Sequence, residues 1–570
     1  MNVSHYFAGA CCNSGEQVAL GGGLGQWRRQ VTYAELDRQV DAAVQVLVGQ
    51  GLQPGDKVLL AVPQSIETYV AMLAILKAGL VVMFIDPAHG AVVTSRCLRA
   101  HPPAAVVGTR SALLLRLLLP ELRKIRKVFV CGGRSGNATP ICDGREAQRT
   151  LRPVARSNAD SALLTFTSGS SGTPKAVLRT HGFLRNQMNV LGPVAKLRAG
   201  DIDLVAMPMF VLLNLANNVT SILPACSVKR PGRAEPRAIY AQLRDEHASR
   251  IVASPALLER LANHCLRSGL TLDHLHCVAT GGGPVSPSLP DRLAAIAPKA
   301  TIRTVYGSTE AEPIAAIDRE QVSVADKRRM REGRGLLVGR PVRGCDLRIL
   351  RDCPTATPQL QHENEFRSRC LERNQVGEIV VAGKHVLPGY ADQSFDAGTK
   401  LNVDGRRWHR TGDAGYIDDR GRLWLLGRCA AAIRDPGGTI YPFQIEYAAC
   451  AVRGIRRAAL LAQHRKKVLV LETSARDFEA GCIDAARCSV AGSVDRIVIV
   501  RHIPMDRRHD AKVDYPALQR MLESRIERLR HATIATLSMA SEAIRSLTFD
   551  LRALLSGRIG RRSGSVRRDV

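Results

Sequence analysis

Residues 165–175 combine hydroxyl groups, glycines and a lysine directly after a short apolar run at 162–164. They read Thr-Phe-Thr-Ser-Gly-Ser-Ser-Gly-Thr-Pro-Lys. Hydroxyl and backbone N–H groups donate hydrogen bonds, and glycine lets the backbone close around an anion without a side chain in the way. The loop differs from the Gly-Lys-Ser/Thr phosphate loop of nucleoside triphosphatases, because Pro174 precedes Lys175. A surface turn has the same composition, so the interpretation as a phosphate site depends on the rest of the chain.

Seven further short motifs follow this loop. They are Ala-Thr-Gly-Gly-Gly-Pro at 279–284, Val-Tyr-Gly-Ser-Thr-Glu at 305–310, Gly-Glu-Ile-Val-Val-Ala-Gly at 377–383, Arg-Thr-Gly-Asp-Ala-Gly-Tyr at 410–416, Leu-Gly-Arg at 426–428, Ile-Tyr-Pro at 440–442 and His-Asp-Ala-Lys at 509–512. In order and spacing the set resembles the acyl-adenylate-forming superfamily, which includes acyl-CoA synthetases, luciferases and the adenylation domains of peptide synthetases. The resemblance covers roughly residues 30–520.

The resemblance implies that ATP and Mg²⁺ activate a carboxylic acid, with attack on the α-phosphorus, release of pyrophosphate and transfer of the acyl group to CoA. Transfer to a carrier-protein thiol is an alternative acceptor reaction. Local features at 180–184, 210–215, 306–313 and 508–512 resemble the fatty-acid-CoA-ligase-like branch that includes the β-lactone synthetase of bacterial olefin biosynthesis. In that branch the hydroxyl of a 3-hydroxy fatty acid closes a β-lactone ring without CoA.

The motifs identify candidate residues for this chemistry. The resemblance implies that Tyr306 stacks on adenine, Thr309 hydrogen-bonds phosphate, and Glu310 supplies an oxygen ligand for Mg²⁺. Asp413, an acceptor when ionised, would hold the ribose hydroxyls, and Lys175 would act as a mobile cation. The remaining candidate nucleotide-binding residues are Thr167, Ser168, Gly169, Ser170, Ser171, Gly172, Thr173, Gly281, Gly282, Gly283, Gly307, Ser308 and Arg428. Each residue alone would be read as an ordinary turn, strand or surface position, so their joint order carries the prediction.

Lys512 is the strongest single candidate for catalysis. In the family, a C-terminal lysine bridges the incoming carboxylate and the α-phosphate, a task that suits a flexible point charge. A surface lysine in a basic chain is the alternative. The family commonly has Asp or Lys two residues after the arginine of the Leu-Gly-Arg motif, where the C-terminal domain rotates, but this chain has Ala430. The ease of that rotation is therefore in question.

Residues 208–216 occupy the position of the family's acyl pocket and are apolar apart from Asn214. An amino-acid-activating domain usually has an aspartate here to pair with the substrate ammonium, and none is present. The segment therefore favours a fatty or related apolar acid, whose alkyl chain can be buried. Phe210, Leu213 and Asn214 are the candidate pocket residues, although some of them are equally typical of core packing.

The elements that position these motifs follow from hydrophobic periodicity. Residues 31–110 alternate between helical and strand-like patterns, with a capping box at Thr32 and Glu35, strands at 58–62 and 81–85 and a helix at 66–80. This alternation predicts an α/β fold with helix-covered parallel sheets. The polar stretch 352–375 is expected to be a loop before the strand at Gly377.

Length and composition shift predict two domains and a tail. Residues 1–427 are expected to form a large N-terminal domain of helix-covered β-sheets plus a distorted β-barrel-like part. Residues 428–524 are expected to form a small, mobile α+β domain with strands at 458–461, 468–471 and 497–500. The arginine-rich segment 525–570 is expected to be a helical or disordered tail, which could contact a membrane surface.

Composition limits the remaining alternatives. No apolar run approaches the roughly 20 residues that span a bilayer, the first 15 residues show no secretion signal, and the 15 cysteines are scattered without Cys-x-x-Cys pairs. We therefore expect a cytoplasmic protein. The net charge of +28 is spread along the chain without a nucleic-acid-binding motif, so we predict no specific nucleic-acid partner. A non-catalytic relative that binds nucleotide or acyl-AMP is the remaining alternative from another class.

Overall fold

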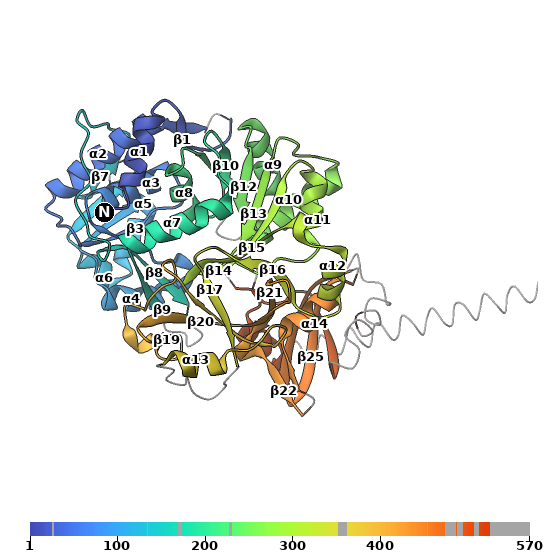
Figure 1. Ribbon diagram of the computed structural model, residues 1–570. Helices are drawn as coiled ribbons and strands as arrows, with labels where there is room; N and C mark the ends of the chain where they lie inside the picture. The colour runs from blue at the N-terminus through green and yellow to red at the C-terminus, as the bar shows by residue number, and fades with distance from the viewer. Residues whose placement is uncertain are drawn as a thin grey trace, which may run out of the picture.

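The computed structural model describes residues 1–25, 28–133, 135–168, 174–226, 231–351, 362–436, 438–452, 454–473, 486, 494–506 and 512–524. Residues 169–173 of the candidate phosphate loop, the side chain of Ser168 and the basic tail from 525 lie outside this description. The described chain forms two large sheets with helices around them, and a smaller group of elements that follows in sequence (Figure 1). The fold is thus a mixed α/β architecture, as the sequence predicts.

The first large sheet has seven strands in the order β7-β6-β5-β3-β4-β8-β9. Six of these strands run parallel, and β9 closes the sheet antiparallel to β8. The bounds are β3 (Lys57–Ala61), β4 (Val81–Met83), β5 (Ala105–Thr109), β6 (Lys127–Cys131), β7 (Thr139–Cys142), β8 (Ser161–Ser168) and β9 (Pro174–Thr180). The candidate phosphate loop therefore connects β8 to β9.

The second large sheet joins a parallel half to an antiparallel half. The parallel half contains β1 (Val18–Gly22), β10 (Ile202–Val205), β11 (Thr220–Leu223), β12 (Arg250–Ala253), β13 (Cys277–Gly281) and β14 (Thr301–Ser308), with β2 (Arg29–Thr32) at its edge. The antiparallel half contains β15 (Ala311–Asp318), β16 (Leu336–Pro341), β17 (Asp346–Leu350), β18 (Gly377–Ala382), β19 (Lys400–Val403), β20 (Arg406–Ile417) and β21 (Leu423–Arg428). The part expected as a distorted barrel is thus continuous with the parallel sheet through β14 and β15.

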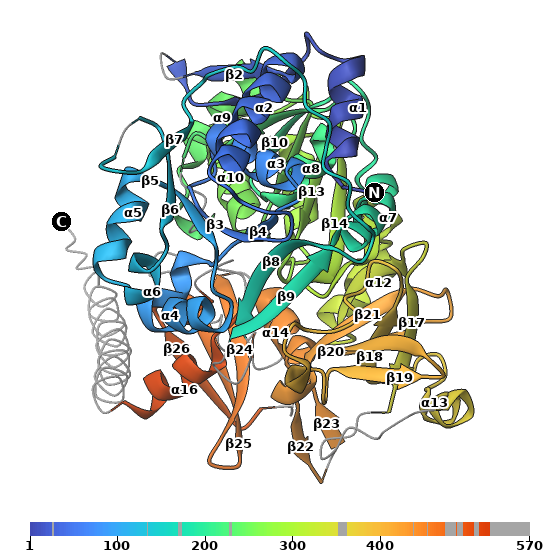
Figure 2. The same ribbon diagram turned by 90° about the vertical axis from the view of Figure 1, so that its left-hand side faces the viewer.

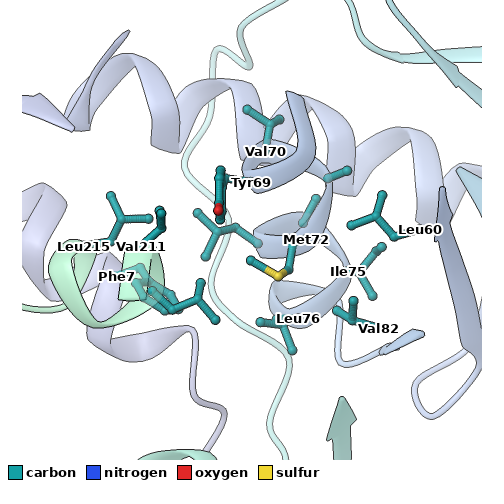
Figure 3. Packing of buried hydrophobic residues seen from close by; sticks show 14 of the residues in the cluster. Phe7, Leu60, Tyr69, Val70, Met72, Ile75, Leu76, Val82, Val211 and Leu215 are labelled. Atoms are coloured by element: carbon teal, nitrogen blue, oxygen red, sulfur yellow. The ribbon is translucent and has the colours of Figure 1, made fainter. Parts of the chain in front are cut away.

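Helices cover both sheets, and the largest core lies around α3 (Ile66–Lys77), which is buried on all sides. Figure 3 shows Tyr69, Met72 and Ile75 of α3 packed near Phe7 of α1 and Val211 of α8. The other helices of the large domain are α1 (His5–Asn13), α2 (Tyr33–Gly49), α4 (Gly90–Ala100), α5 (Arg110–Leu113), α6 (Pro120–Arg123), α7 (His181–Ala195), α8 (Met209–Leu215), α9 (Pro236–Asp245), α10 (Pro255–Ser268), α11 (Leu289–Ile296), α12 (Val324–Arg331) and α13 (Glu363–Arg369). Short 3-10 turns connect several of them.

A small α+β group follows β21. It contains the hairpin β22 (Ile433–Asp435) and β23 (Gly438–Ile440), and a three-stranded sheet of β24 (Ile455–Gln463), β25 (Lys466–Thr473) and β26 (Arg496–Val500). Helices α14 (Pro442–Cys450) and α16 (Tyr515–Glu523) pack against this sheet. The three strands coincide with those predicted from the apolar runs.

Local sequence signals predict some element ends correctly and miss others, such as the strand predicted over 81–85, which ends at Met83. Thr32 and Glu35 form the predicted capping box, with Thr32 Oγ1 accepting from Glu35 N and Glu35 Oε2 accepting from Thr32 N. The helix predicted to reach residue 80 ends instead at Lys77, because Gly79 adopts a left-handed φ of 74° and Leu80 N–H bonds back to Ile75. The predicted loop 352–375 contains α13 in its second part. Across the described ranges, every helix is too short or too polar to cross a bilayer.

Candidate active site

Two glycine-containing segments lie side by side at the carboxyl ends of β13 and β14. Gly281, the last residue of β13, pairs with Val305 of the parallel strand β14. A Cβ atom on Gly281 would lie 2.6 Å from the Val305 carbonyl oxygen, so this position has no room for a side chain. Gly282 follows with a φ of 77°, and a Cβ there would meet the Met207 methyl group at 3.3 Å. The carboxyl ends of parallel strands are where α/β sheets bind ligands, and here bare backbone is exposed to such a ligand.

Tyr306, Asp413 and Arg428 are in direct contact. The Tyr306 hydroxyl donates to Asp413 Oδ2 at 2.8 Å, and Arg428 Nη1 donates to Asp413 Oδ1 at 2.9 Å. Arg428 Nη1 also donates to the Thr411 carbonyl at 3.0 Å. Burial and the neighbouring Asp413 carboxylate raise the pKa of Tyr306 well above its ordinary value. The structure thus brings together three candidate residues that are separated by up to 122 positions in sequence (428 − 306).

Glu310 lies beside two residues that the sequence reasoning did not single out. Its Oε1 accepts a hydrogen bond from the Tyr390 hydroxyl at 2.8 Å. The Lys175 ammonium lies 5.0 Å from the centroid of the Tyr390 ring, and the Lys400 ammonium lies 5.5 Å from it. Lys400 is buried and donates to the Leu387 carbonyl. Two lysines and one carboxylate therefore surround a single tyrosine ring.

Charge neutralisation keeps Glu310 ionised in this setting. Burial alone would raise its pKa, but the hydrogen bond from the Tyr390 hydroxyl and the nearby Lys400 ammonium lower it below the ordinary value. Burial lowers the pKa of Lys400 to about 8 and that of His409 to about 3. At neutral pH the cluster thus contains an ionised Glu310, a mostly charged Lys400 and a neutral His409 imidazole.

The chemistry of this donor set fits Mg²⁺ held partly by phosphate. In the described part of the chain, no group of three or more His, Cys, Asp or Glu side chains converges as a metal site would require. Mg²⁺ is commonly bound by one or two carboxylates together with substrate phosphates and water, and Glu310 can supply one such carboxylate. Among the described residues, the buried hydroxyls of Thr280 and Ser308 have no hydrogen-bond partner, as expected of groups that face a ligand.

Arg179 of β9 is a further buried cation near Thr309. It donates to Thr165 Oγ1 at 2.9 Å and to the Thr309 carbonyl at 3.1 Å, which ties the β8–β9 hairpin to the turn after β14. Burial lowers its pKa from the ordinary arginine value. The sequence contained no signal for Arg179 or Lys400. Tyr390 could have been found, because a Gly-Tyr pair follows the motif at 377–383.

The candidate pocket residues lie on α8, in the interior of the large domain. Phe210 and Leu213 pack in the main core. Asn214 is fully buried, and its amide nitrogen donates to Asp203 Oδ2 and Ser221 Oγ, both at 3.1 Å. This amide is therefore already engaged within the protein. Met207, just before α8, is the side chain of this segment that reaches the Gly282 turn.

Lys512 is exposed and stands at the end of a loop whose base is closed by hydrogen bonds. Asp506 N–H donates to the Lys512 carbonyl at 2.8 Å, and Lys512 N–H donates to Asp506 Oδ1 at 3.1 Å. Asp514 N–H donates to the Pro504 carbonyl at 2.9 Å. Residues 507–511 between these pairs lie outside the described residues. Both hydrogen bonds of Lys512 are with Asp506, in the same small group of elements. Asp413 belongs to β20 and Glu310 follows β14, so these contacts do not join Lys512 to the other candidate residues. Ala430 lies exposed in the turn after β21.

The helix after Lys512 is held by a buried carboxyl group, which leads to a prediction on pH. Glu446 Oε1 accepts from the Tyr515 hydroxyl at 2.6 Å and from Leu460 N at 2.9 Å, and burial raises the Glu446 pKa to about 7. Because the folded pKa lies above the ordinary 4.5, this group stabilises the fold most below pH 4.5 and loses that contribution as the pH rises to about 7. The loss is expected to be at most roughly 3 kcal/mol. In thermal denaturation between pH 4.5 and about 7, the Glu446→Gln variant should lose less stability with rising pH than the wild type. The same pH dependence in both proteins would show that another group titrates.

Gly281→Ala is predicted to disturb the nucleotide cradle. The added methyl group would clash with the Val305 carbonyl, since 2.6 Å is below any real Cβ contact. We expect a loss of about 1–3 kcal/mol in the free energy of unfolding and weaker ATP binding. Gly192→Ala in α7 is the matched control, because a Cβ there meets nothing within 4 Å and should be neutral or stabilising. Denaturant unfolding and ATP titration of both variants measure the difference. Equal unfolding free energies and ATP affinities for the two variants would contradict a role of Gly281 in nucleotide binding.

Comparisons with known proteins show the family to which this chain is similar. A family profile described as "AMP-binding enzyme" matches residues 10–391. The olefin beta-lactone synthetase of Stenotrophomonas maltophilia (strain K279a) is 30% identical over 516 residues, covering 86% of this chain and 91% of the relative. The 4-coumarate–CoA ligase 5 of Oryza sativa subsp. japonica is 26% identical over 435 residues, covering 75% of each chain.

Solved structures show the same fold. The ATP-bound MatB of Rhodopseudomonas palustris superposes with a TM-score of 0.75 at 21% identity, covering 92% of this chain and all of that one. The amide bond synthetase McbA of Marinactinospora thermotolerans superposes with a TM-score of 0.74 at 22% identity, covering 91% of this chain and 99% of that one.

Proposed function

Because this chain belongs to the family of AMP-binding enzymes, we propose that it forms an acyl-adenylate from a fatty or related apolar carboxylic acid and ATP, and releases pyrophosphate. The observation that carries the proposal is the contact of Tyr306 and Arg428 with the Asp413 carboxylate, which joins three motifs that are distant in sequence. The apolar character of the segment at 208–216 supports a fatty acid over an amino acid.

Each residue of the site would make a different contact with the nucleotide or with Mg²⁺. Asp413 would accept hydrogen bonds from the ribose hydroxyls, with Tyr306 and Arg428 holding its two oxygens in place. Adenine would lie against the backbone of the segment at 281–283. Bound Mg²⁺, held by Glu310 and phosphate oxygens, would supply charge for the departing pyrophosphate. These contacts hold the nucleotide in position before the acid attacks, which lowers the entropic part of the barrier.

Positive side chains complete the site. Lys175 and the hydroxyl-rich loop at 167–173 would hold the β- and γ-phosphates. Arg179 ties that hairpin to the Thr309 turn, and Lys400 keeps Glu310 ionised. Lys512 would bridge the attacking carboxylate and the α-phosphate. This requires the small domain to swing toward the large one, and Ala430 is proposed as part of the hinge.

The acceptor of the acyl group has three candidates. Transfer to CoA is the first, and the identity to a 4-coumarate–CoA ligase supports it. Intramolecular closure of a β-lactone from a 3-hydroxy fatty acid is the second, and the higher identity to the olefin beta-lactone synthetases favours it. In that reaction the substrate hydroxyl attacks its own activated carbonyl carbon, a four-membered ring forms, and AMP leaves. Transfer to a carrier-protein thiol is the third outcome to test.

Mass spectrometry of the products tests the proposal and separates these acceptors. Purified protein is incubated with ATP, Mg²⁺, and a panel of fatty and 3-hydroxy fatty acids, with and without CoA. An acyl-CoA identifies the ligase, and a β-lactone that forms equally without CoA identifies ring closure. Release of AMP with neither product points to a carrier protein. If no acid in the panel causes AMP release, the protein is a non-catalytic nucleotide binder and the proposal is wrong.

A further inference from the structure

A compact group of exposed leucines lies at the edge of the large domain, on the turn that connects α5 to α6. Leu114, Leu115, Leu117 and Leu118 have exposed fractions of 63%, 45%, 68% and 73%. They are four of the ten large apolar side chains that are exposed among the described residues, and no other part of that set is adjacent in sequence. We refer to these four residues as the leucine surface. Scattered exposed leucines are normal, but a contiguous group marks an interaction site.

The protein core does not require the leucine surface. The same segment contributes four other apolar residues to the core below it, namely Leu113, Leu119, Leu122 and Ile125, each no more than 9% exposed. These residues anchor the turn to the sheet through β5 and β6. The outer leucines therefore add no packing to the fold, and their burial must come from something outside it.

Arginine side chains satisfy the backbone of this turn internally. Arg116 donates to the carbonyls of Leu122 at 3.2 Å and Ile125 at 2.9 Å. Arg123 donates in return to the carbonyls of Arg116 at 3.0 Å and Leu117. Carbonyl groups that would otherwise need water are thus partly paired within the protein. This arrangement suits a surface that enters an apolar, water-poor environment, where unpaired backbone groups are costly.

The surroundings of the leucine surface are basic. Residues 110–127 contain six Lys and Arg residues and one acidic residue, Glu121, which accepts from Ser95 at 2.8 Å. Arg110, Arg123, Lys124 and Arg126 are exposed. Helix α4 packs against α6 and adds the exposed Arg96 and Arg99. Figure 2 shows α4, α5 and α6 together along one side of the molecule, beside β8 and β9.

We propose that the leucine surface docks this protein on anionic lipid bilayers, with the leucines inserted among the acyl chains and the surrounding arginines and lysines on the headgroups. Apolar side chains ringed by basic residues are the features that bind a charged membrane interface. The positive charge of the surface argues against two other partners, namely a second copy of this chain and its own segment at 525–570. A second copy carries the same net charge of +28, and the tail at 525–570 contains ten arginines against four acids, so each would bring like charges together.

This inference does not depend on the proposed function, but it has a consequence for it. Helix α4 packs against β9, and the ring of His101 at its end lies 5.7 Å from the Phe166 ring of β8 at a tilt of 55°, so the docking face adjoins the hairpin of the candidate phosphate loop. An enzyme for apolar acids would then meet its substrate at the membrane, where such acids concentrate.

Vesicle co-sedimentation of the full-length protein tests the docking surface. The vesicles are pure phosphatidylcholine or phosphatidylcholine mixed with phosphatidylglycerol. The variant Leu114→Ser/Leu117→Ser/Leu118→Ser removes the apolar contacts at positions that do not support the core. We expect the wild type to bind the anionic vesicles, the triple variant to bind them at least about tenfold more weakly, and both to bind neutral vesicles poorly.

Controls separate this surface from general basicity. Val324→Ser changes an 81% exposed apolar residue elsewhere and should leave vesicle binding unchanged. Arg123→Glu/Lys124→Glu should weaken binding to anionic vesicles. Equal binding of the triple variant and the wild type would overturn the proposal and assign the lipid contact to the tail. A wild-type dimer that becomes monomeric in the triple variant, seen by sedimentation velocity without a change in vesicle binding, would overturn it in favour of self-association.

Discussion

Lys512→Ala is expected to lower the rate of acid-dependent adenylate formation about 100- to 1,000-fold. A charged group aimed at the transition state of an in-line displacement contributes about 3–4 kcal/mol, and in the proposed reaction Lys512 supplies that charge between the carboxylate and the α-phosphate. Lys512 is exposed and its contacts with Asp506 use only backbone atoms on the Lys512 side, so truncation of the side chain leaves the loop base intact. Pyrophosphate release in the presence of acid measures the effect.

A control variant and a measurement of product formation from the acyl-adenylate test the role of Lys512 further. Lys466→Ala removes another exposed lysine from the same small group of elements, at the start of β25, and should retain full activity. When the acyl-adenylate is supplied directly, Lys512→Ala should form the final product at close to the wild-type rate, because the lysine acts only before the acid is bonded to AMP. Wild-type adenylation by Lys512→Ala would contradict the role assigned to this lysine.

The sequence predicts features that depend on a few neighbouring residues, such as the capping box at Thr32 and Glu35. The glycines at 281 and 282 were predicted through their motif, and the structure adds the close approach of the Val305 carbonyl to Gly281. Tyr306 and Asp413 were predicted through ordered motifs, and the structure adds their direct contact. Local pattern also predicted the three strands of the small sheet, since each is a continuous apolar run.

The remaining parts of the site depend on packing between distant segments. Glu310 meets Tyr390 across 80 positions, and Arg179 meets Thr309 across 130. Lys400 lies in an unremarkable polar stretch, and only the fold makes it a buried cation beside a tyrosine ring. No periodicity or short motif encodes such contacts, so sequence reasoning could not find them.

Asn214, in contrast, has a clear sequence signal that allows two interpretations. As the one polar residue in an apolar segment, it invites an interpretation as a substrate ligand. In the structure it belongs to a buried polar network with Asp203 and Ser221, and Arg250 lies 3.7 Å from Asp203. Arg250 in turn donates to the Ala195 carbonyl at the end of α7 at 2.8 Å. A polar residue inside an apolar run thus indicates a buried partner as readily as a ligand, and the sequence alone does not distinguish them.

Glu310→Gln is expected to lower adenylate formation about 100- to 1,000-fold and to raise the Mg²⁺ concentration needed for half-maximal rate. Glutamine keeps the shape of the side chain and can still accept the Tyr390 hydrogen bond, so the substitution removes charge with little change in packing. The lost charge also removes one of the two carboxylates that act on the buried Lys400, and Asp396 is the other. Pyrophosphate release at fixed ATP and varied Mg²⁺ measures both effects.

Two further variants distinguish a metal ligand from a structural partner of Tyr390. Tyr390→Phe removes only the hydrogen bond to Glu310 and keeps the ring beside Lys175 and Lys400, so it should reduce the rate by about tenfold and leave the Mg²⁺ dependence unchanged. Glu320→Gln, at a carboxylate that is 56% exposed, should behave as the wild type. If Glu310→Gln and Tyr390→Phe lose the same activity at an unchanged Mg²⁺ requirement, Glu310 serves to hold Tyr390, and the metal must be bound by phosphate and water alone.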